Sequence, residues 1–124
     1  MIVLDASVLI SHLIEDVHSA RALDIIDTEE ELAIHPMTLA ECLVGPVRVG
    51  REVEAMRTLD ALGIERLPIG DQQPLALATL RATTPLKLPD CCVLAAAIET
   101  GATLATFNTA LAKVASEHGV AVAQ

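Results

Sequence analysis

The chain has 124 residues, which is enough for one domain with a hydrophobic core and too few for two ordinary domains. Hydrophobic residues make up 52% of the chain, and this fraction excludes a disordered, polar protein. With 17 acidic and 8 basic residues the net charge is −9, which counts against a nucleic-acid partner unless bound cations reverse the charge of an acidic pocket.

The cysteines and the apolar runs indicate the cellular setting. The three cysteines are odd in number and match no zinc spacing, and the neighbours Cys91 and Cys92 are poor partners for a disulfide. We therefore expect reduced thiols in a cytoplasmic protein. The longest apolar run, residues 91–98, is too short to cross a bilayer, so we expect no membrane contact.

The first stretch of the chain predicts a buried strand followed by a helix. Ile2, Val3 and Leu4 are large and apolar, two of them are β-branched, and Asp5 closes the run. The residues that follow have helical spacing, and Ser7 or Asp5 is available as a cap. Asp5 should therefore stand at the carboxyl end of a parallel strand, where open α/β sheets bind ligands.

The remaining chain alternates between strands and helices. We expect helices over residues 17–26, 38–43, 51–62, 71–83, 90–100 and 110–118, and strands over residues 32–35, 64–67, 103–106 and 120–122. Gly45-Pro46 is expected to end the helix that opens at Thr38, and Val17, Ala20, Leu23 and Ile26 are expected to share the inner face of theirs. The alternation predicts a three-layer α/β fold over residues 1–124, in which helices cover both faces of a parallel sheet of four to five strands.

Four polar side chains should meet at the carboxyl edge of this sheet. Asp5 follows the first strand, Glu41 lies in the helix after the second, Asp90 opens the alanine-rich helix, and Asn108 follows the strand at 103–106. Three carboxylates and an amide are hard oxygen ligands that suit Mg²⁺ or Mn²⁺. Such ions activate water and neutralise phosphate charge.

Each of these positions has a purely structural alternative. Asp5 and Asn108 have the positions of helix N-caps. Thr38-Leu39-Ala40-Glu41 matches a capping box, in which Glu41 would serve only the helix backbone. Asp90 is the exception, because a carboxylate at the head of an apolar helix stripe is costly unless it is paired or bound to a metal.

Taken together, four segments resemble a PIN domain, and most closely the short VapC-type toxins of prokaryotic toxin–antitoxin pairs. The segments are Ile2-Val3-Leu4-Asp5-Ala6-Ser7-Val8-Leu9-Ile10, Thr38-Leu39-Ala40-Glu41, Leu88-Pro89-Asp90 and Leu104-Ala105-Thr106-Phe107-Asn108. They stand in the family's order and span nearly the whole chain. The family commonly has Asp where this chain has Asn108, and the lost charge favours one bound ion over two.

The resemblance implies a metal-dependent endoribonuclease that hydrolyses RNA phosphodiesters and is held inactive by a cognate antitoxin. Its catalytic positions correspond here to Asp5, Glu41, Asp90 and Asn108. Asp5 and Asp90 would hold Mg²⁺ or Mn²⁺, while Ser7 and Thr106 would support them by hydrogen bonds.

The sequence also allows other interpretations of single residues and of the function. Arg48 and Arg51 form a modest basic edge, which is either a solvated helix face or a contact to RNA phosphates. The high apolar fraction favours a homodimer. The missing charge at Asn108 leaves room for a weakly active or non-catalytic protein-interaction module. A phosphatase with Asp5 as nucleophile is disfavoured, because Ser7 stands where that chemistry needs a second Asp.

Overall fold

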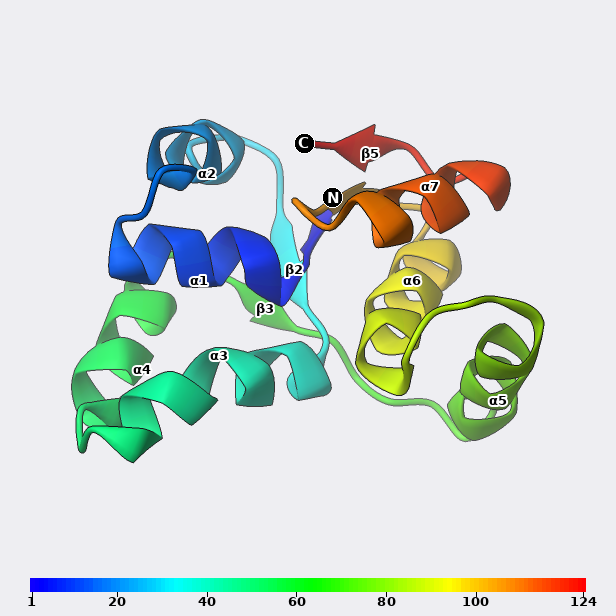
Figure 1. Cartoon of the computed structure of the whole chain (residues 1–124), viewed down its shortest axis with the longest axis horizontal. Coiled ribbons are helices and arrows are strands. Elements are labelled where there is room, and N and C mark those ends of the chain that lie inside the picture. Colours follow the sequence, from blue (N-terminus) through cyan, green and yellow to red (C-terminus); the bar gives the residue numbers. More distant parts are fainter.

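Five parallel strands form one sheet in the order β3-β2-β1-β4-β5 (Figure 1). The structure is a computed structural model and describes residues 1–124. The strands are β1 (Ile2–Leu4), β2 (Leu32–Ile34), β3 (Glu65–Arg66), β4 (Thr103–Ala105) and β5 (Val122–Ala123). The helices are α1 (Ala6–Ile14), α2 (Ser19–Ile26), α3 (Pro36–Arg48), α4 (Glu52–Ala61), α5 (Gln73–Thr83), α6 (Leu88–Thr100) and α7 (Thr109–Glu117). The expected α/β fold with a parallel sheet is confirmed.

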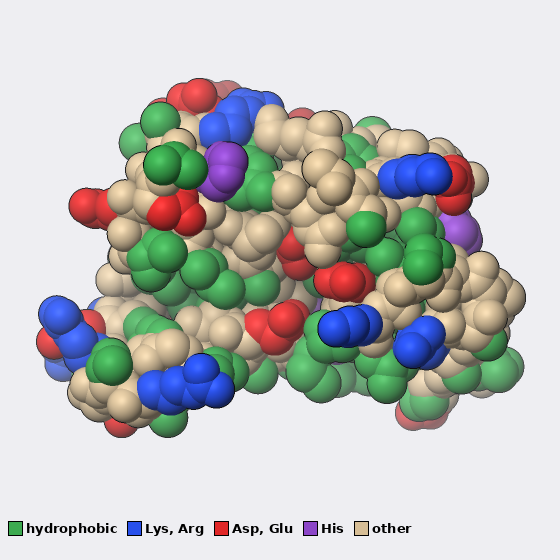
Figure 2. Space-filling model, in the orientation of Figure 1, with side chains coloured by type: hydrophobic (Ala, Val, Ile, Leu, Met, Phe, Trp, Pro, Cys, Tyr) green, Lys and Arg blue, Asp and Glu red, His purple; other side chains and the backbone are tan.

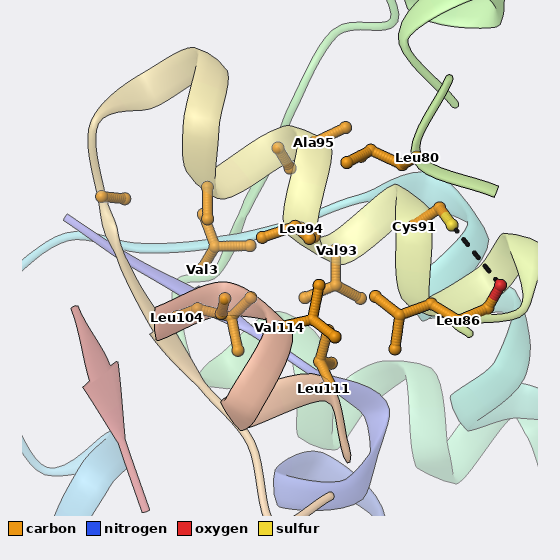
Figure 3. Close-up of a cluster of buried hydrophobic side chains, with 14 of the residues drawn as sticks. Val3, Leu80, Leu86, Cys91, Val93, Leu94, Ala95, Leu104, Leu111 and Val114 are labelled. Atoms are coloured by element: carbon orange, nitrogen blue, oxygen red, sulfur yellow. Dashed lines mark hydrogen bonds between the residues drawn. The ribbon is translucent and has the colours of Figure 1, made fainter. Parts of the chain in front are cut away.

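Helices cover both faces of the sheet, and each face has its own apolar core. Because side chains alternate along a strand, Val3 points to one face and its neighbours Ile2 and Leu4 point to the other. Val3 and Leu104 pack with residues of α5, α6 and α7, as Figure 3 shows, whereas Ile2 and Leu4 pack with residues of α1 to α4. None of the helices combines the length and the apolar character that spanning a membrane requires.

The strand order puts the end of β1 at a switch point. The chain moves from β1 outward to β2 and β3, then returns to pair β4 with the other edge of β1. The register Leu4↔Ala105 aligns the two strands so that Asp5 and Thr106 both follow the last paired residues. Connections leave this point in opposite directions, which opens a crevice at the carboxyl ends of the strands.

Helix α6 is the buried helix of the fold. All seven residues from Cys91 to Ala97 are buried, and the alanines allow this helix to lie close to the sheet and to α5. It begins two residues earlier than expected, because Pro89 fits in the first turn, where no backbone N–H is needed. Asp90 is consequently the third residue of the helix.

Two local expectations are wrong. In α2 the buried residues are Ala22, Ile25 and Ile26, while Leu23 is 52% exposed and Val17 precedes the helix. Residues spaced by three drift about 60° around a helix at each step, so the stripe that begins at Val17 cannot stay on one face. Helix α3 also continues through Gly45-Pro46 to Arg48: the φ angle of proline fits a helix, and the helix goes on for two residues although Pro46 provides no N–H.

A buried polar link fixes the start of α3 against α5. The Met37 N–H donates to His35 Nδ1 at 3.0 Å, so His35 is the N-cap of α3. That bond leaves the ring proton on Nε2, which lies 2.7 Å from Gln73 Oε1 and donates to it. His35 and Gln73 are both buried, so Nε2 of His35 and Oε1 of Gln73 depend on each other for a partner.

We expect His35→Ala to lower the free energy of unfolding by about 2–4 kcal/mol, because it removes the cap and leaves Oε1 of Gln73 without a donor. Chemical denaturation monitored by circular dichroism measures this. His35→Asn should lose less, since Asn is a good N-cap, although it does not reach Gln73. Equal losses in the two variants would contradict the role of His35 as a cap.

Candidate active site

Asp5 is buried at the end of β1 and is held by two hydroxyl groups. It is 5% exposed, and its Oδ2 accepts bonds from Ser7 Oγ at 2.6 Å and from Thr106 Oγ1 at 2.7 Å. Its side chain makes no capping bond to α1, so the cap alternative is wrong for Asp5. The carboxylate instead joins β1 to the residue that follows β4.

The backbone after β4 fixes the direction of both hydroxyl groups. Ser7 Oγ accepts the Phe107 N–H at 3.0 Å, and Thr106 Oγ1 accepts the Asn108 N–H at 2.9 Å. Each hydroxyl therefore uses its proton on Asp5. The other oxygen of Asp5, Oδ1, makes no hydrogen bond within the chain and is not sealed in the core, because Thr38 Oγ1 is the sole fully buried side-chain polar atom without a partner.

Glu41 lies on α3 and takes no part in capping it. The N-cap is His35, so Thr38 is the third residue of the helix and its side chain is buried. The capping-box alternative for Glu41 is therefore wrong: the motif letters fit, but the helix starts before Thr38. The carboxyl group of Glu41 is left free on a half-buried face.

Asp5, Glu41 and Asp90 lie close enough to repel one another. Burial raises the pKa of Glu41, and the charges of Asp5 and Asp90 raise it further. Burial also raises the pKa of Asp90, with a second contribution from Asp5, while Lys87 acts in the opposite direction. Neither ion pair of the chain, Arg51–Glu54 or Arg66–Asp60, involves these acids. Figure 2 shows acidic side chains around the hollow at the middle of this face.

Asn108 is brought to the same edge, but its amide oxygen is already engaged. Asn108 Oδ1 accepts the N–H groups of Ala110 at 3.0 Å and Leu111 at 3.1 Å, which caps α7. The capping alternative is thus confirmed for Asn108.

Buried thiols lie beside the acids. Burial, Glu41 and Asp5 together raise the pKa of Cys42 to about 12, and burial, Cys91 and Glu41 raise the pKa of Cys92. Cys42 and Cys92 therefore stay protonated and do not act as nucleophiles. Cys42 follows Glu41 directly in the chain, whereas the place of Cys92 near Glu41 depends on how α3 and α6 pack and could not be read from sequence spacing.

The model of the PIN-domain family matches residues 2–117. The chain belongs to the PIN-domain family. PIN domains are nucleases, and in general they use divalent metal ions. A search among curated proteins finds no significant match.

Solved PIN-like structures resemble this chain over most of its length. It is similar to a protein in a toxin–antitoxin complex from Klebsiella pneumoniae, with 28% identity, 88% of each chain covered and a TM-score of 0.72. It also resembles FitAcB from Neisseria gonorrhoeae, with 23% identity, 100% of this chain and 97% of that chain covered, and a TM-score of 0.76. VapBC2 from Rickettsia felis, bound to a DNA fragment from its promoter, has 18% identity, coverages of 98% and 97%, and a TM-score of 0.72.

The donors at this PIN site fit a hard, hydrated cation. Asp5 Oδ1 has no partner in the chain, and the mutual repulsion of the acids is what a bound cation relieves. No three acidic, His or Cys side chains lie close enough to coordinate one ion by themselves. That suits Mg²⁺, which usually keeps several waters and binds through one or two carboxylates.

We expect metal-free Asp90→Asn to be more stable than the wild type at pH 7, by up to about 4 °C in Tm for a gain below about 1 kcal/mol. The raised pKa of Asp90 means that its ionisation destabilises the fold as the pH rises above its ordinary value of 3.8. The difference in Tm between Asp90→Asn and the wild type should therefore shrink toward pH 4. Calorimetry in EDTA measures this difference, with Asp24→Asn, at an exposed position of α2, as the control. An Asp90→Asn variant that is no more stable than Asp24→Asn at pH 7 would contradict the repulsion.

Proposed function

We propose that this PIN domain is a metal-dependent endoribonuclease and the toxin component of a toxin–antitoxin pair. The observation that carries the proposal is the approach of Asp5, Glu41 and Asp90 at the carboxyl edge of the sheet, where burial and the neighbouring negative charges raise the pKa of Glu41 and of Asp90. These oxygen donors favour Mg²⁺ or Mn²⁺ as the cofactor.

Asp5 and Asp90 are the proposed metal ligands. Oδ2 of Asp5 is held by Ser7 and Thr106, whereas Oδ1 has no hydrogen-bond partner in the chain. Asp90 lies in the first turn of α6. A bound divalent cation supplies charge neutralisation at the phosphate and lowers the pKa of water. Because Asp5 and Asp90 would hold the cation, they would determine which phosphate of the RNA it contacts.

Glu41 is the proposed proton acceptor. A general base works best when its pKa lies near the working pH, and burial together with Asp5 and Asp90 raises the pKa of Glu41 in that direction. Glu41 would orient the attacking water and take its proton on a carboxylate oxygen. The P–O bond to the leaving ribose oxygen breaks as the new P–O bond forms, and the leaving oxygen takes a proton from water to give a hydroxyl group.

Ser7, Thr106 and Asn108 are proposed to position the ligands. Ser7 and Thr106 hold Asp5 in one orientation, and their own directions depend on the N–H groups of Phe107 and Asn108. Asn108 caps α7 with its side chain and holds Thr106 with its backbone, so it acts on the site through the turn. We propose a single bound ion, because Asn108 carries no charge and its Oδ1 is engaged in the cap of α7.

The likeness to a protein in a toxin–antitoxin complex, at 28% identity, supports the proposal that a cognate antitoxin protein binds this chain. The buried free thiols of Cys42, Cys91 and Cys92 support a reducing, cytoplasmic place of action. Large apolar side chains that stay exposed on α5 and α6, such as Leu75 and Ile98, support a homodimer.

We expect the purified protein to cleave single-stranded RNA with Mg²⁺ or Mn²⁺, and we expect EDTA to abolish the cleavage. The Asp5→Asn variant should cleave at least about 100-fold more slowly. Gel analysis of labelled RNA measures cleavage, and circular dichroism checks that the variant folds. Asp24→Asn should cleave like the wild type.

Either of two outcomes would contradict the proposal. If folded wild-type protein cuts no RNA with either metal, the non-catalytic alternative is favoured. If Asp5→Asn cuts RNA as fast as the wild type, the activity does not come from this site.

A further inference from the structure

A nuclease must hold a polyanion, yet this chain has only eight Lys and Arg residues against seventeen acids. Several of the eight are engaged elsewhere. Arg51 pairs with Glu54 at 2.6 Å, Arg66 pairs with Asp60 at 3.6 Å, and Arg21 donates to the carbonyl of Gln124. Five cations remain without such a partner, namely Arg48, Arg57, Arg81, Lys87 and Lys113, and those nearest the acidic centre are the first candidates to hold RNA.

Lys87 and Arg81 stand next to that centre. Lys87 is the residue before α6, three positions ahead of Asp90, and its charge offsets part of the rise that burial and Asp5 cause in the pKa of that carboxyl group. Arg81 lies in the last turn of α5, and its charge offsets part of the rise that burial and Asp90 cause in the pKa of the neighbouring Cys91. Both cations are exposed, and neither forms an ion pair within the chain. In Figure 2, Lys and Arg side chains border the central acidic group on the side that Figure 1 assigns to α5 and α6.

The backbone at the same place also favours an anion. No side chain caps α6, and the N–H groups of Leu88 and Asp90 have no acceptor within the chain. The positive end of this 13-residue helix therefore lies beside Lys87. Because salt screens exposed charges beyond about 8–10 Å, local cations count more for a bound phosphate than the net charge of −9.

We propose that Arg81 and Lys87, together with the uncapped start of α6, bind the RNA phosphates that flank the one to be cleaved. This inference rests on the proposed ribonuclease function and assigns the substrate anchor of the same site. It differs from the expectation for Arg48 and Arg51. Those residues follow Glu41 by seven and ten positions, about 10 Å or more along α3 and beyond it, and Arg51 is already paired.

The test compares two double variants, R81Q/K87Q and R48Q/R51Q, in an Asp5→Asn background that does not turn over RNA. Labelled single-stranded RNA is titrated at several salt concentrations, with Mg²⁺ held constant. R81Q/K87Q should weaken binding about tenfold at low salt and reduce the slope of log Kd against log salt by about 1.4, since each lost phosphate contact on a single strand removes about 0.7. R48Q/R51Q should leave the slope unchanged, and R81K/K87R should restore it.

With Asp5 present, R81Q/K87Q should raise KM about tenfold and leave kcat within about twofold, because these residues bind substrate and do not touch the reacting atoms. An unchanged KM and salt slope in R81Q/K87Q, or a slope that falls only in R48Q/R51Q, would overturn the inference. Wild-type protein that binds RNA through Arg81 and Lys87 but never cleaves it would instead overturn the proposed function alone.

Discussion

The carboxylate of Asp5 is held by hydroxyl groups from two segments about a hundred residues apart. Ser7 comes from the first turn of α1, and Thr106 from the residue that follows β4. This is possible because β1 and β4 pair in parallel with Leu4 opposite Ala105, so that both strands end at the same level. The two hydroxyl groups are oriented in turn by the N–H groups of Phe107 and Asn108. A short buried sheet thus fixes one carboxylate oxygen and leaves the other available for a ligand.

The arrangement of the acids carries a cost in stability that a ligand can offset. Glu41 on α3 and Asp90 on α6 are drawn toward Asp5 by the packing of their helices, and each has a raised pKa because of burial and neighbouring negative charge. The chain provides no ion pair to compensate them. A cation bound among these carboxylates would remove much of that cost, which is what a binding site for a cation and a phosphate requires.

Much of the fold was readable from the sequence, because short apolar runs and helical stripes alternate throughout. The parallel sheet and the position of Asp5 at its carboxyl edge follow from that pattern. Roles that depend on where a helix starts were not readable. Thr38 and Glu41 have the letters of a capping box, but His35 caps α3 three residues before Thr38, and Pro36 begins the helix. For Asn108 the sequence allowed both a cap and a ligand, and only the direction of its side chain, which accepts two N–H groups of α7, decides for the cap.

The most direct test of this account is a crystal structure of the protein grown with Mn²⁺, with data collected for the anomalous signal of manganese. The account predicts an anomalous peak at bonding distance, about 2.1 Å for a small divalent ion, from Asp5 Oδ1 and adjoining Asp90, and its loss in crystals of Asp5→Asn. Manganese bound only elsewhere on the surface, with no peak among Asp5, Glu41 and Asp90 in the wild-type crystal, would contradict the account.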